Sequence, residues 1–367
     1  MRSAAICLVG LACQTRGGTP TAHVAAAREI AIVPNPPGAS GRDVGFSLAW
    51  NGHSVWVFGD TFFAQPAADG YQWRASTWSW TDDTDASTGL PDWQHALGAD
   101  GKPLQLIPHT ADEQAFDDAH NGSPCPVGSD CGARHTAWPA TPLADPSRGA
   151  IVFYSKEDTE PTGSFAFHGT GASIAVWPSL DAAAVRADVS NGPDSTTLFG
   201  PDEPGWGAAA LIDADLLYAY ACDGGSLTSP CRIARVPLTS ALDRSAWAFW
   251  TSAAWVADWH AAAPIFDGAP LMTVHYSEYF SRWVAFYVVP LRSTLAVRFA
   301  PRPEGPWSGA ELFGEGAPPA DGTWDYGLAA HHEFAREGGR VEYLSYFQPG
   351  SFLDGVVHLL EVTYQPE

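Results

Sequence analysis

Two aspartates near the start of the chain lie at the open end of a predicted β-hairpin. The dipeptide Asn51-Gly52, between two strand-like runs, is the strongest short signal for a two-residue hairpin loop. Counting outward from this turn places Asp43 directly opposite Asp60. Directly opposed residues have Cβ atoms about 4.5–5.5 Å apart, so these carboxylates should approach the separation of about 5–5.5 Å that retaining glycosidases use. The spacing therefore predicts a nucleophile and an acid/base for glycoside hydrolysis.

The same pair has a non-catalytic interpretation. Like charges that face each other destabilise a strand pair, and their proximity raises one pKa, as a general acid requires. Alternatively, Asp43 caps the start of a strand and Asp60 begins a turn, with both carboxylates in water. A β-bulge in either strand would also change the register. Spacing alone leaves both interpretations open.

Strands rather than helices are expected to position this pair. The chain has 36 Gly, 30 Pro and 12% aromatic residues, a composition that favours strands and turns. Five segments each combine a small apolar run, a turn and an aromatic-rich strand: 44–60, 136–155, 207–221, 270–289 and 327–347. Further strands follow each one, so we predict an all-β fold, a single five-bladed β-propeller over residues 28–367 with about four antiparallel strands per blade. A β-sandwich remains the alternative.

Other candidate residues follow from this topology. In a propeller, the entrances of the inner strands surround one funnel, and the Asp- and Gly-rich segment from about 81 to 133 is expected to be a long excursion beside it. The predicted substrate-binding residues are Arg42, His135, Trp206, Tyr326 and His332. Most of the 16 Trp must pack between blades, so core packing is the alternative for any one of them. Candidates for a third carboxylate are Glu278 and Glu333, with a solvated strand end as the alternative.

The N-terminus is typical of an exported protein. Residues 1–13 combine a charged start with a short apolar run, which predicts a signal peptide. The run Val9-Gly10-Leu11-Ala12-Cys13 resembles a bacterial lipobox, which would attach a lipid to Cys13; an ordinary signal peptide is the alternative. Residues 14–27 would then form a flexible tether. We expect a periplasmic or outer-surface lipoprotein, or otherwise a secreted protein, with membrane contact only through that lipid.

The four remaining cysteines form two local pairs, Cys125 with Cys131 and Cys222 with Cys231. Export favours a disulfide for each pair, whereas neither pair has the CxxC spacing of a zinc site. No organic cofactor or metal ligand set is predicted. A structural calcium ion on the propeller axis stays open, without a ligand motif to support it.

Charge and missing motifs exclude several classes of function. The net charge of −22, without a Lys/Arg cluster, excludes nucleic acid as an expected partner. No GxSxG or HExxH motif is present, which excludes the common serine hydrolases and zinc proteases. A monomer is expected.

The segments around the acidic pair resemble a known family. Gly41-Arg42-Asp43-Val44-Gly45 and Phe58-Gly59-Asp60-Thr61 are similar to the first-blade signature of a bacterial family of formerly unknown function. That family includes actinobacterial endo-D-arabinanases and resembles five-bladed propeller glycosidases. Residues 231–237, 305–308, 331–334 and 344–346 are similar in kind, and the resemblance runs from about residue 28 to the C-terminus.

The resemblance implies a retaining hydrolysis of arabinofuranosyl linkages, with Asp43 as the nucleophile and Asp60 as the acid/base. His331-His332 departs from the family, which more often has His-Pro, and this leaves the substrate open. We expect a glycoside hydrolase that acts on a furanose-containing polysaccharide such as arabinan. The alternatives are a non-catalytic carbohydrate- or envelope-binding propeller lipoprotein and a scaffold lipoprotein that binds another protein.

Overall fold

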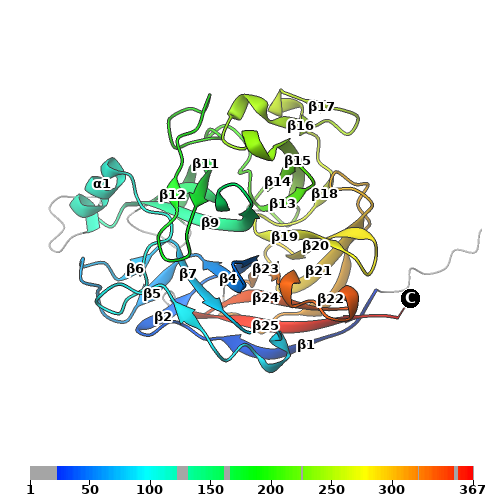
Figure 1. Ribbon diagram of the computed structural model, residues 1–367, viewed down its shortest axis with the longest axis horizontal. Coiled ribbons are helices and arrows are strands. Elements are labelled where there is room, and N and C mark those ends of the chain that lie inside the picture. Colours follow the sequence, from blue (N-terminus) through cyan, green and yellow to red (C-terminus); the bar gives the residue numbers. More distant parts are fainter. Residues whose placement is uncertain are drawn as a thin grey trace, which may run out of the picture.

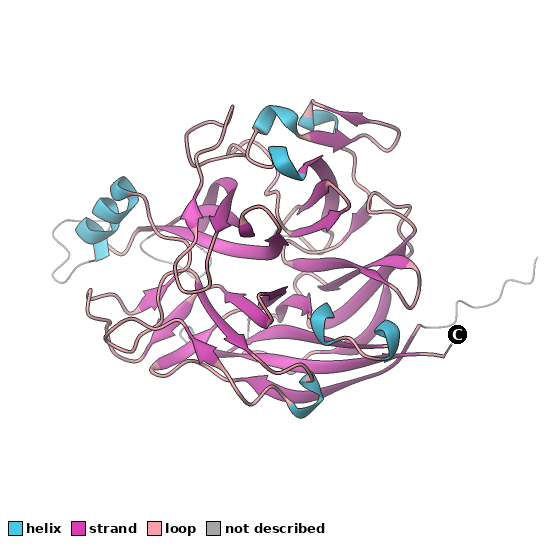
Figure 2. Ribbon diagram, viewed as in Figure 1, coloured by secondary structure: helices cyan, strands magenta, loops and turns pink. Residues whose placement is uncertain are grey.

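The computed structural model describes residues 23–121, 131–160, 166–224, 226–320, 322–350 and 354–366. Over these residues the protein is all-β, as predicted, and its one α-helix lies at the edge of the molecule (Figures 1 and 2). No helix within the described ranges has both the length and the apolar character needed to cross a membrane.

The described strands form antiparallel sheets that follow one another along the chain. The first consists of β3 (Phe46–Trp50), β4 (His53–Phe58), β7 (Thr77–Thr81) and β8 (Gln94–His95). The second consists of β9 (Arg134–Asp145), β10 (Gly149–Thr159), β11 (Phe167–Trp177) and β12 (Val185–Arg186). The third consists of β13 (Ala209–Asp213), β14 (Leu216–Cys222), β15 (Pro230–Pro237), β16 (Ala248–Trp250) and β17 (Trp255–Val256), with β18 (Phe266–Asp267) beside β15.

The fourth sheet consists of β19 (Met272–Ser277), β20 (Arg282–Val288), β21 (Thr294–Ala300) and β22 (Glu311–Glu315). The fifth consists of β23 (Tyr326–Ala330), β24 (Val341–Pro349), β25 (Gly355–Tyr364) and, from the other end of the chain, β1 (Val24–Val33). A smaller sheet of β2 (Ala39–Arg42), β5 (Thr61–Phe63) and β6 (Trp73–Arg74) extends the open end of the first hairpin. Each of the five predicted hairpins therefore supplies the first two strands of one large sheet.

The five large sheets follow one another in a ring. The first strand of each sheet contacts the first strand of the next, in the order β3, β9, β13, β19, β23 and back to β3. Five buried apolar clusters fill the spaces between successive sheets, and the last of them joins the fifth sheet to the first. Small residues such as Ala209 and Ala329 let the first strands lie close together, while Trp and Phe side chains fill the wider spaces outside. This differs from the two packed sheets of the alternative fold.

Strand β1 closes the ring with the C-terminal strand. It pairs with β25 from Val24↔Tyr364 to Val33↔Val357, so strands near both termini share a sheet (Figure 1). The strand begins at Val24, inside the segment 14–27 that was expected to be a tether, so residues 24–27 are a correction to that boundary. The predicted signal peptide and lipobox at residues 1–13 lie outside the described residues.

The excursion between the first and second sheets contains a helix that sequence periodicity did not indicate. Helix α1 (Ala111–Asn121) begins with a capping box. The Thr110 amide donates to Glu113 Oε2 at 3.0 Å, and the Glu113 amide donates to Thr110 Oγ1 at 3.3 Å. This arrangement satisfies two amides of the first turn, and the sequence signal for it was present in Thr110 and Glu113.

One predicted disulfide is described in full. Cys222 and Cys231 are bonded, with Cα atoms 4.0 Å apart, at facing positions of β14 and β15. Cys131 is also disulfide-bonded, and its predicted partner Cys125 lies outside the described residues.

Candidate active site

The first hairpin has the predicted turn and register. Asn51 and Gly52 both have positive φ, 53° and 85°, as a type I′ turn requires. Phe46 faces Val57 on one side of the acidic pair, and Arg42 faces Thr61 on the other. The register is the same on both sides and places Asp43 opposite Asp60. The Asp43 amide also donates a hydrogen bond to the Asp60 carbonyl oxygen at 3.0 Å.

The backbone around Asp43 leaves regular strand geometry to make room for its carboxylate. Asp43 Oδ1 lies over Gly59, where an added Cβ would be only 2.1 Å from it. Val44 has a φ of 45°, which β-branched residues rarely adopt. Its side chain packs against Gly327, where a Cβ would lie 2.4 Å from Val44 Cγ1. Glycine at positions 59 and 327 therefore leaves the space that the side chains of Asp43 and Val44 occupy.

Asp43 lies in an environment that favours its protonated form. Tyr326 Oη donates a hydrogen bond to Asp43 Oδ2 at 2.9 Å, while Oδ1 is buried without a hydrogen-bond partner. Burial, followed by the negative charge of Asp60, raises the pKa of Asp43 to about 8. Burial and the charge of Asp43 also raise the pKa of Tyr326 far above its ordinary value, so the phenol stays a donor.

Asp60 has neighbours that stabilise its anion. Trp138 Nε1 donates a hydrogen bond to Asp60 Oδ1 at 3.1 Å. Burial raises the pKa of Asp60 to about 6, because the positive charge of Arg134 and the Trp138 hydrogen bond counteract part of the burial effect. The Arg134 guanidinium lies 3.8 Å from the ring centroid of Trp73. As whole residues both aspartates are half-buried, although Asp43 Oδ1 itself is buried.

Two aromatic side chains contact the carboxylates, Tyr326 at Asp43 and Trp138 at Asp60, and two more pack behind them. Tyr326, Trp138 and Trp73 are half-buried. Phe167, an exposed residue, packs its ring edge-to-face with Trp138 at 4.7 Å between centroids. Tyr326 and Trp138 each present an apolar ring face and a polar hydrogen-bond donor beside the acidic groups. The site therefore offers an acid, a carboxylate anion and adjacent aromatic surface.

Of the predicted substrate-binding residues, Tyr326 joins the acidic pair, but Arg42 and Trp206 do not. Arg42 is 2% exposed, donates to the Pro34 carbonyl oxygen at 2.7 Å and to Ser79 Oγ at 2.8 Å, and lies over Phe58. Burial lowers the pKa of Arg42 to about 9. Both of its terminal guanidinium nitrogens donate inside the protein and the side chain is buried, which favours a structural role for Arg42. Trp206 is also 2% exposed and packs between the second and third sheets, the core alternative considered for it.

His135 lies near the site but on the wrong face of its strand. Its Nδ1 contacts Asp158 Oδ1 at 2.5 Å, and its backbone amide donates to Asp117 Oδ1 at 2.9 Å. Alternate residues of a strand point to the same face, so Arg134 and Trp138 share the face opposite to that of His135. These two residues were missed. The period of two along β9 would have selected them once Asp60 was placed beside that strand.

His332 and the two candidate third carboxylates do not join the aspartates. His332 follows the end of β23, whereas Tyr326, at the start of β23, holds Asp43. Glu333 accepts a hydrogen bond from Ser54 Oγ at 2.6 Å, and burial raises its pKa. Glu278 is exposed at the turn after β19, the solvated strand end considered for it.

Comparison with known proteins identifies a family and similar folds. The family described as "Domain of unknown function (DUF4185)" matches residues 36–358. No curated protein matches the chain. A candidate hydrolase from Bacteroides ovatus ATCC 8483 has a similar structure, with a TM-score of 0.59 and 14% identity over 89% of this chain and 87% of that one. Zg3597, a family 117 glycoside hydrolase from Zobellia galactanivorans, has a TM-score of 0.51 and 10% identity over 92% and 90% of the two chains. At these identities the similarity shows the fold alone.

Proposed function

The chain belongs to the DUF4185 family, and we propose that it is a glycoside hydrolase that works through Asp43 and Asp60 with retention of configuration. One observation carries the proposal. Two facing, half-buried aspartates have different environments. Burial and the charge of Asp60 raise the pKa of Asp43 to about 8, whereas Arg134 and Trp138 counteract part of the burial effect on Asp60, whose pKa is raised only to about 6. Near neutral pH, one is then protonated and the other ionised, the two states that glycoside hydrolysis requires at the start of a cycle.

The neighbours favour Asp60 as the nucleophile and Asp43 as the acid/base. Arg134 and Trp138 stabilise the Asp60 anion, whereas desolvation and the negative charge of Asp60 disfavour the Asp43 anion. This is the reverse of the roles that the family resemblance implies. In the first step, Asp60 attacks the anomeric carbon while Asp43 gives its proton to the leaving oxygen. In the second, the Asp43 carboxylate takes a proton from water, and the resulting hydroxide cleaves the glycosyl ester and frees Asp60.

The proposed substrate is a furanose-containing polysaccharide of the cell envelope, such as arabinan. The first-blade resemblance and the aromatic rings of Tyr326, Trp138 and Phe167 beside the carboxylates support it. In the same proposal, the ring of five sheets is a five-bladed propeller, a fold that closes its sheet edges around a central site. The proposal also includes export, with either a lipid on Cys13 or full secretion, and a monomeric protein.

Two asparagine variants test the function and the roles together. Asp60→Asn should be inactive on every substrate, because an amide cannot form the glycosyl ester. Asp43→Asn should lose activity on arabinan by about 10²–10⁴-fold but still cleave an activated aryl arabinofuranoside, and azide should accelerate its deglycosylation. Asp69→Asn, an exposed aspartate paired with Arg74, is the matched control and should retain full activity.

Two other results would change the conclusion. Azide rescue of Asp60→Asn instead of Asp43→Asn would reverse the two roles and leave the hydrolase proposal intact. If the wild type releases no sugar from any furanose glycan and both asparagine variants bind glycan as tightly as the wild type, the protein is a carbohydrate-binding module.

A further inference from the structure

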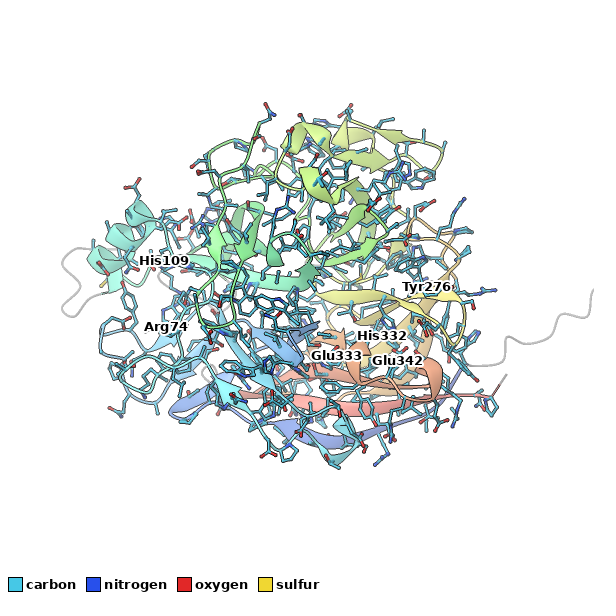
Figure 3. The ribbon with its side chains drawn as sticks, in the orientation of Figure 1. Arg74, His109, Tyr276, His332, Glu333 and Glu342 are labelled. Carbon is cyan, nitrogen blue, oxygen red and sulfur yellow. A yellow bond between two sulfur atoms is a disulfide. The ribbon has the colours of Figure 1, made fainter. Side chains whose placement is uncertain are left out.

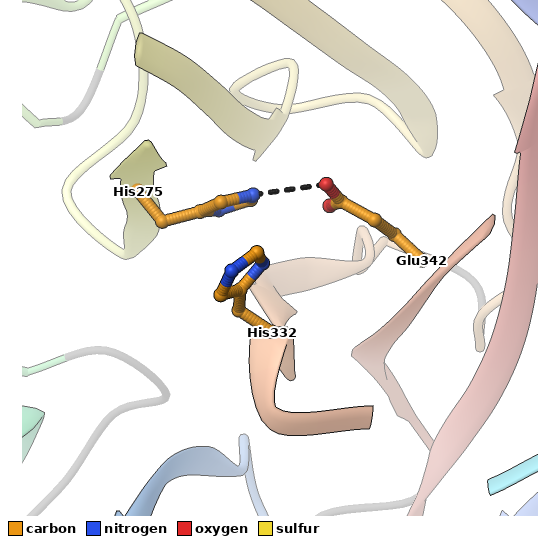
Figure 4. A group of neighbouring side chains, drawn as sticks. All are labelled: His275, His332 and Glu342. Atoms are coloured by element: carbon orange, nitrogen blue, oxygen red, sulfur yellow. Dashed lines mark hydrogen bonds and ion pairs between the residues drawn. The ribbon is translucent and has the colours of Figure 1, made fainter. Parts of the chain in front are cut away.

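A second group of polar residues lies at the other end of β23 from the aspartates. His275 in β19, Glu342 in β24 and His332 in the 3₁₀ turn His332–Phe334 converge there (Figure 4). Figure 3 places His332 and Glu342 in the whole molecule. Their potential ligand atoms all lie within 4.8 Å of one another, and this is the one such group of His, Cys, Asp and Glu among the described residues. Tyr326 starts β23 and the group lies beyond its other end, Ala330; at about 3.3 Å per residue these two ends of the strand are about 13 Å apart. The group is therefore distinct from the proposed active site.

The group contains buried polar atoms that have no partner. Glu342 is fully buried, and its Oε1 lies 3.1 Å from His275 Nε2. Glu342 Oε2 has no hydrogen-bond partner, and neither has the second ring nitrogen of His275, Nδ1. Leaving such a group unsatisfied costs about 1–3 kcal/mol, more when it is charged, so Glu342 Oε2 is available to a ligand that the protein itself does not supply.

We propose that His275, His332 and Glu342 bind one divalent transition-metal ion, for which zinc is the best chemical fit. Two imidazoles and one carboxylate form a common ligand set for zinc, whereas calcium and magnesium prefer oxygen ligands. Two ligand atoms at about 2.0–2.1 Å from a tetrahedral zinc ion lie about 3.3 Å apart, close to the 3.1 Å between His275 Nε2 and Glu342 Oε1.

His332 completes the site by a change of rotamer. Its ring centroid lies 4.8 Å from that of His275, and its side chain is exposed, so it can turn toward the other two ligands without disturbing the core. Three protein ligands leave a fourth position on the solvent side for water.

The metal would join two sheets of the ring. His275 belongs to the fourth sheet, and Glu342 belongs to the fifth, which also carries the turn with His332. A ligand that binds only the folded protein raises its apparent stability in proportion to the logarithm of its concentration. Zinc should therefore raise the unfolding temperature, and this effect needs no sugar and no hydrolysis.

The test measures zinc binding to the full, tag-free chain after treatment with a chelator. Zinc is titrated in competition with a chromophoric chelator, and thermal unfolding is followed with zinc, with calcium and without metal. The wild type should take up one tight equivalent and unfold at a higher temperature with zinc but not with calcium. His332→Ala and Glu342→Gln should each weaken that equivalent by about 100-fold and abolish the thermal shift. His260→Ala, which removes an exposed histidine beside Asp258, is the control and should behave as the wild type does.

His332→Ala keeps the test valid if Glu342→Gln does not fold, because His332 is exposed. A wild type that binds zinc no more tightly than His332→Ala would overturn the proposal. Because both readouts are independent of hydrolysis, failure here leaves the proposed function untouched, and failure of the proposed function leaves the metal site untouched.

Discussion

Asp43 and Asp60 are the same residue type at paired backbone positions, so any difference in their chemistry must come from their neighbours. Asp43 has the Tyr326 hydroxyl and a buried oxygen without a partner. Asp60 has the Trp138 indole and the charge of Arg134. Because the two carboxyls interact, the pair releases its protons in two steps that belong to the pair as a whole.

The pH dependence of the wild type should report these two steps. The nucleophile must be ionised, so kcat/KM should rise as pH increases through about 6, the pKa of Asp60. The acid must be protonated, so kcat/KM should fall as pH increases through about 8, the pKa of Asp43. Initial rates on arabinan between acidic and alkaline pH check this. A rate that is constant from acidic to alkaline pH would contradict the assignment.

Arg134 should set the acidic side of that profile. Arg134→Gln removes the charge that lowers the pKa of Asp60, so the rising limb should move to higher pH by roughly one unit. Arg134→Lys, which keeps the charge, should restore most of the original position. Arg74→Gln, which removes an arginine paired with Asp69, is the control. A merely structural role for Arg134 would lower the rate equally at every pH.

At the residue scale, the sequence could predict the register of a hairpin, which depends on one turn. It could not predict which residues of one sheet contact residues of the next. The Asn51-Gly52 loop fixes its own register, so the facing aspartates were predictable. Arg134 and Trp138 come from the next sheet. To choose them, one must know which alternate residues of β9 face the first hairpin, which is far away in the chain. The sequence does not show which face of β9 that is, and the prediction named His135, which lies on the opposite face. Trp206 shows the same difficulty, since a tryptophan near a strand entrance can equally pack between sheets.

At the element scale, the open end of the first hairpin depends on a glycine. Gly59→Ala would place a methyl group 2.1 Å from Asp43 Oδ1, so the carboxylate must move. A displacement of about 1 Å in a reacting group can cost about 10²-fold in rate, and we expect at least that loss with little change in unfolding temperature. Gly309→Ala is the control, because nothing lies within 4 Å of the added Cβ. Full activity in Gly59→Ala would show that Asp43 does not need its present position.

The disulfide of the third sheet should contribute to stability. Cys222 and Cys231 are nine residues apart and join facing positions of β14 and β15. In the chain-entropy description, closing a loop of this size lowers the entropy of the unfolded chain and so raises the free energy of unfolding by about 2–3 kcal/mol. The double variant Cys222→Ala/Cys231→Ala should lose that much free energy of unfolding in a denaturant titration. An unchanged transition midpoint would show that the Cys222–Cys231 disulfide does not stabilise the folded protein.

Element boundaries were harder to predict than element types. The five hairpins were predictable because each has a turn between a run of small apolar residues and an aromatic-rich run. Helix α1 was not, since its polar sequence has little apolar period, and only the pair Thr110 and Glu113 indicated its start. Strand β1 starts earlier than expected because Ala26 and Ala27 read as tether by composition, while their pairing with β25 depends on the far end of the chain.

At the scale of the whole molecule, the ring depends on the meeting of the two ends of the chain. Strand β1 covers one edge of β25, and its Arg28 contacts Glu361 of β25 at 2.8 Å. Glu361 also binds Arg336 Nη2 at 2.7 Å and the Tyr343 hydroxyl at 2.9 Å. The last apolar cluster, between the fifth and first sheets, includes Val33 of β1. The N-terminal strand therefore contributes both backbone pairing and core packing to the closure.

Removal of Val24–Val33 should consequently weaken the whole fold. The loss would expose the edge of β25, and exposed strand edges pair with other chains. We expect the unfolding temperature to fall by roughly 10 °C or more, where each kcal/mol corresponds to about 2–4 °C for large domains, and we expect soluble aggregates in size-exclusion chromatography. Arg28→Ala separates the two contributions, because it removes one ion pair, between the exposed Arg28 and the buried Glu361, and keeps the strand. If the truncated chain remained monomeric and unfolded at the wild-type temperature, closure by β1 would not be what holds the five sheets together.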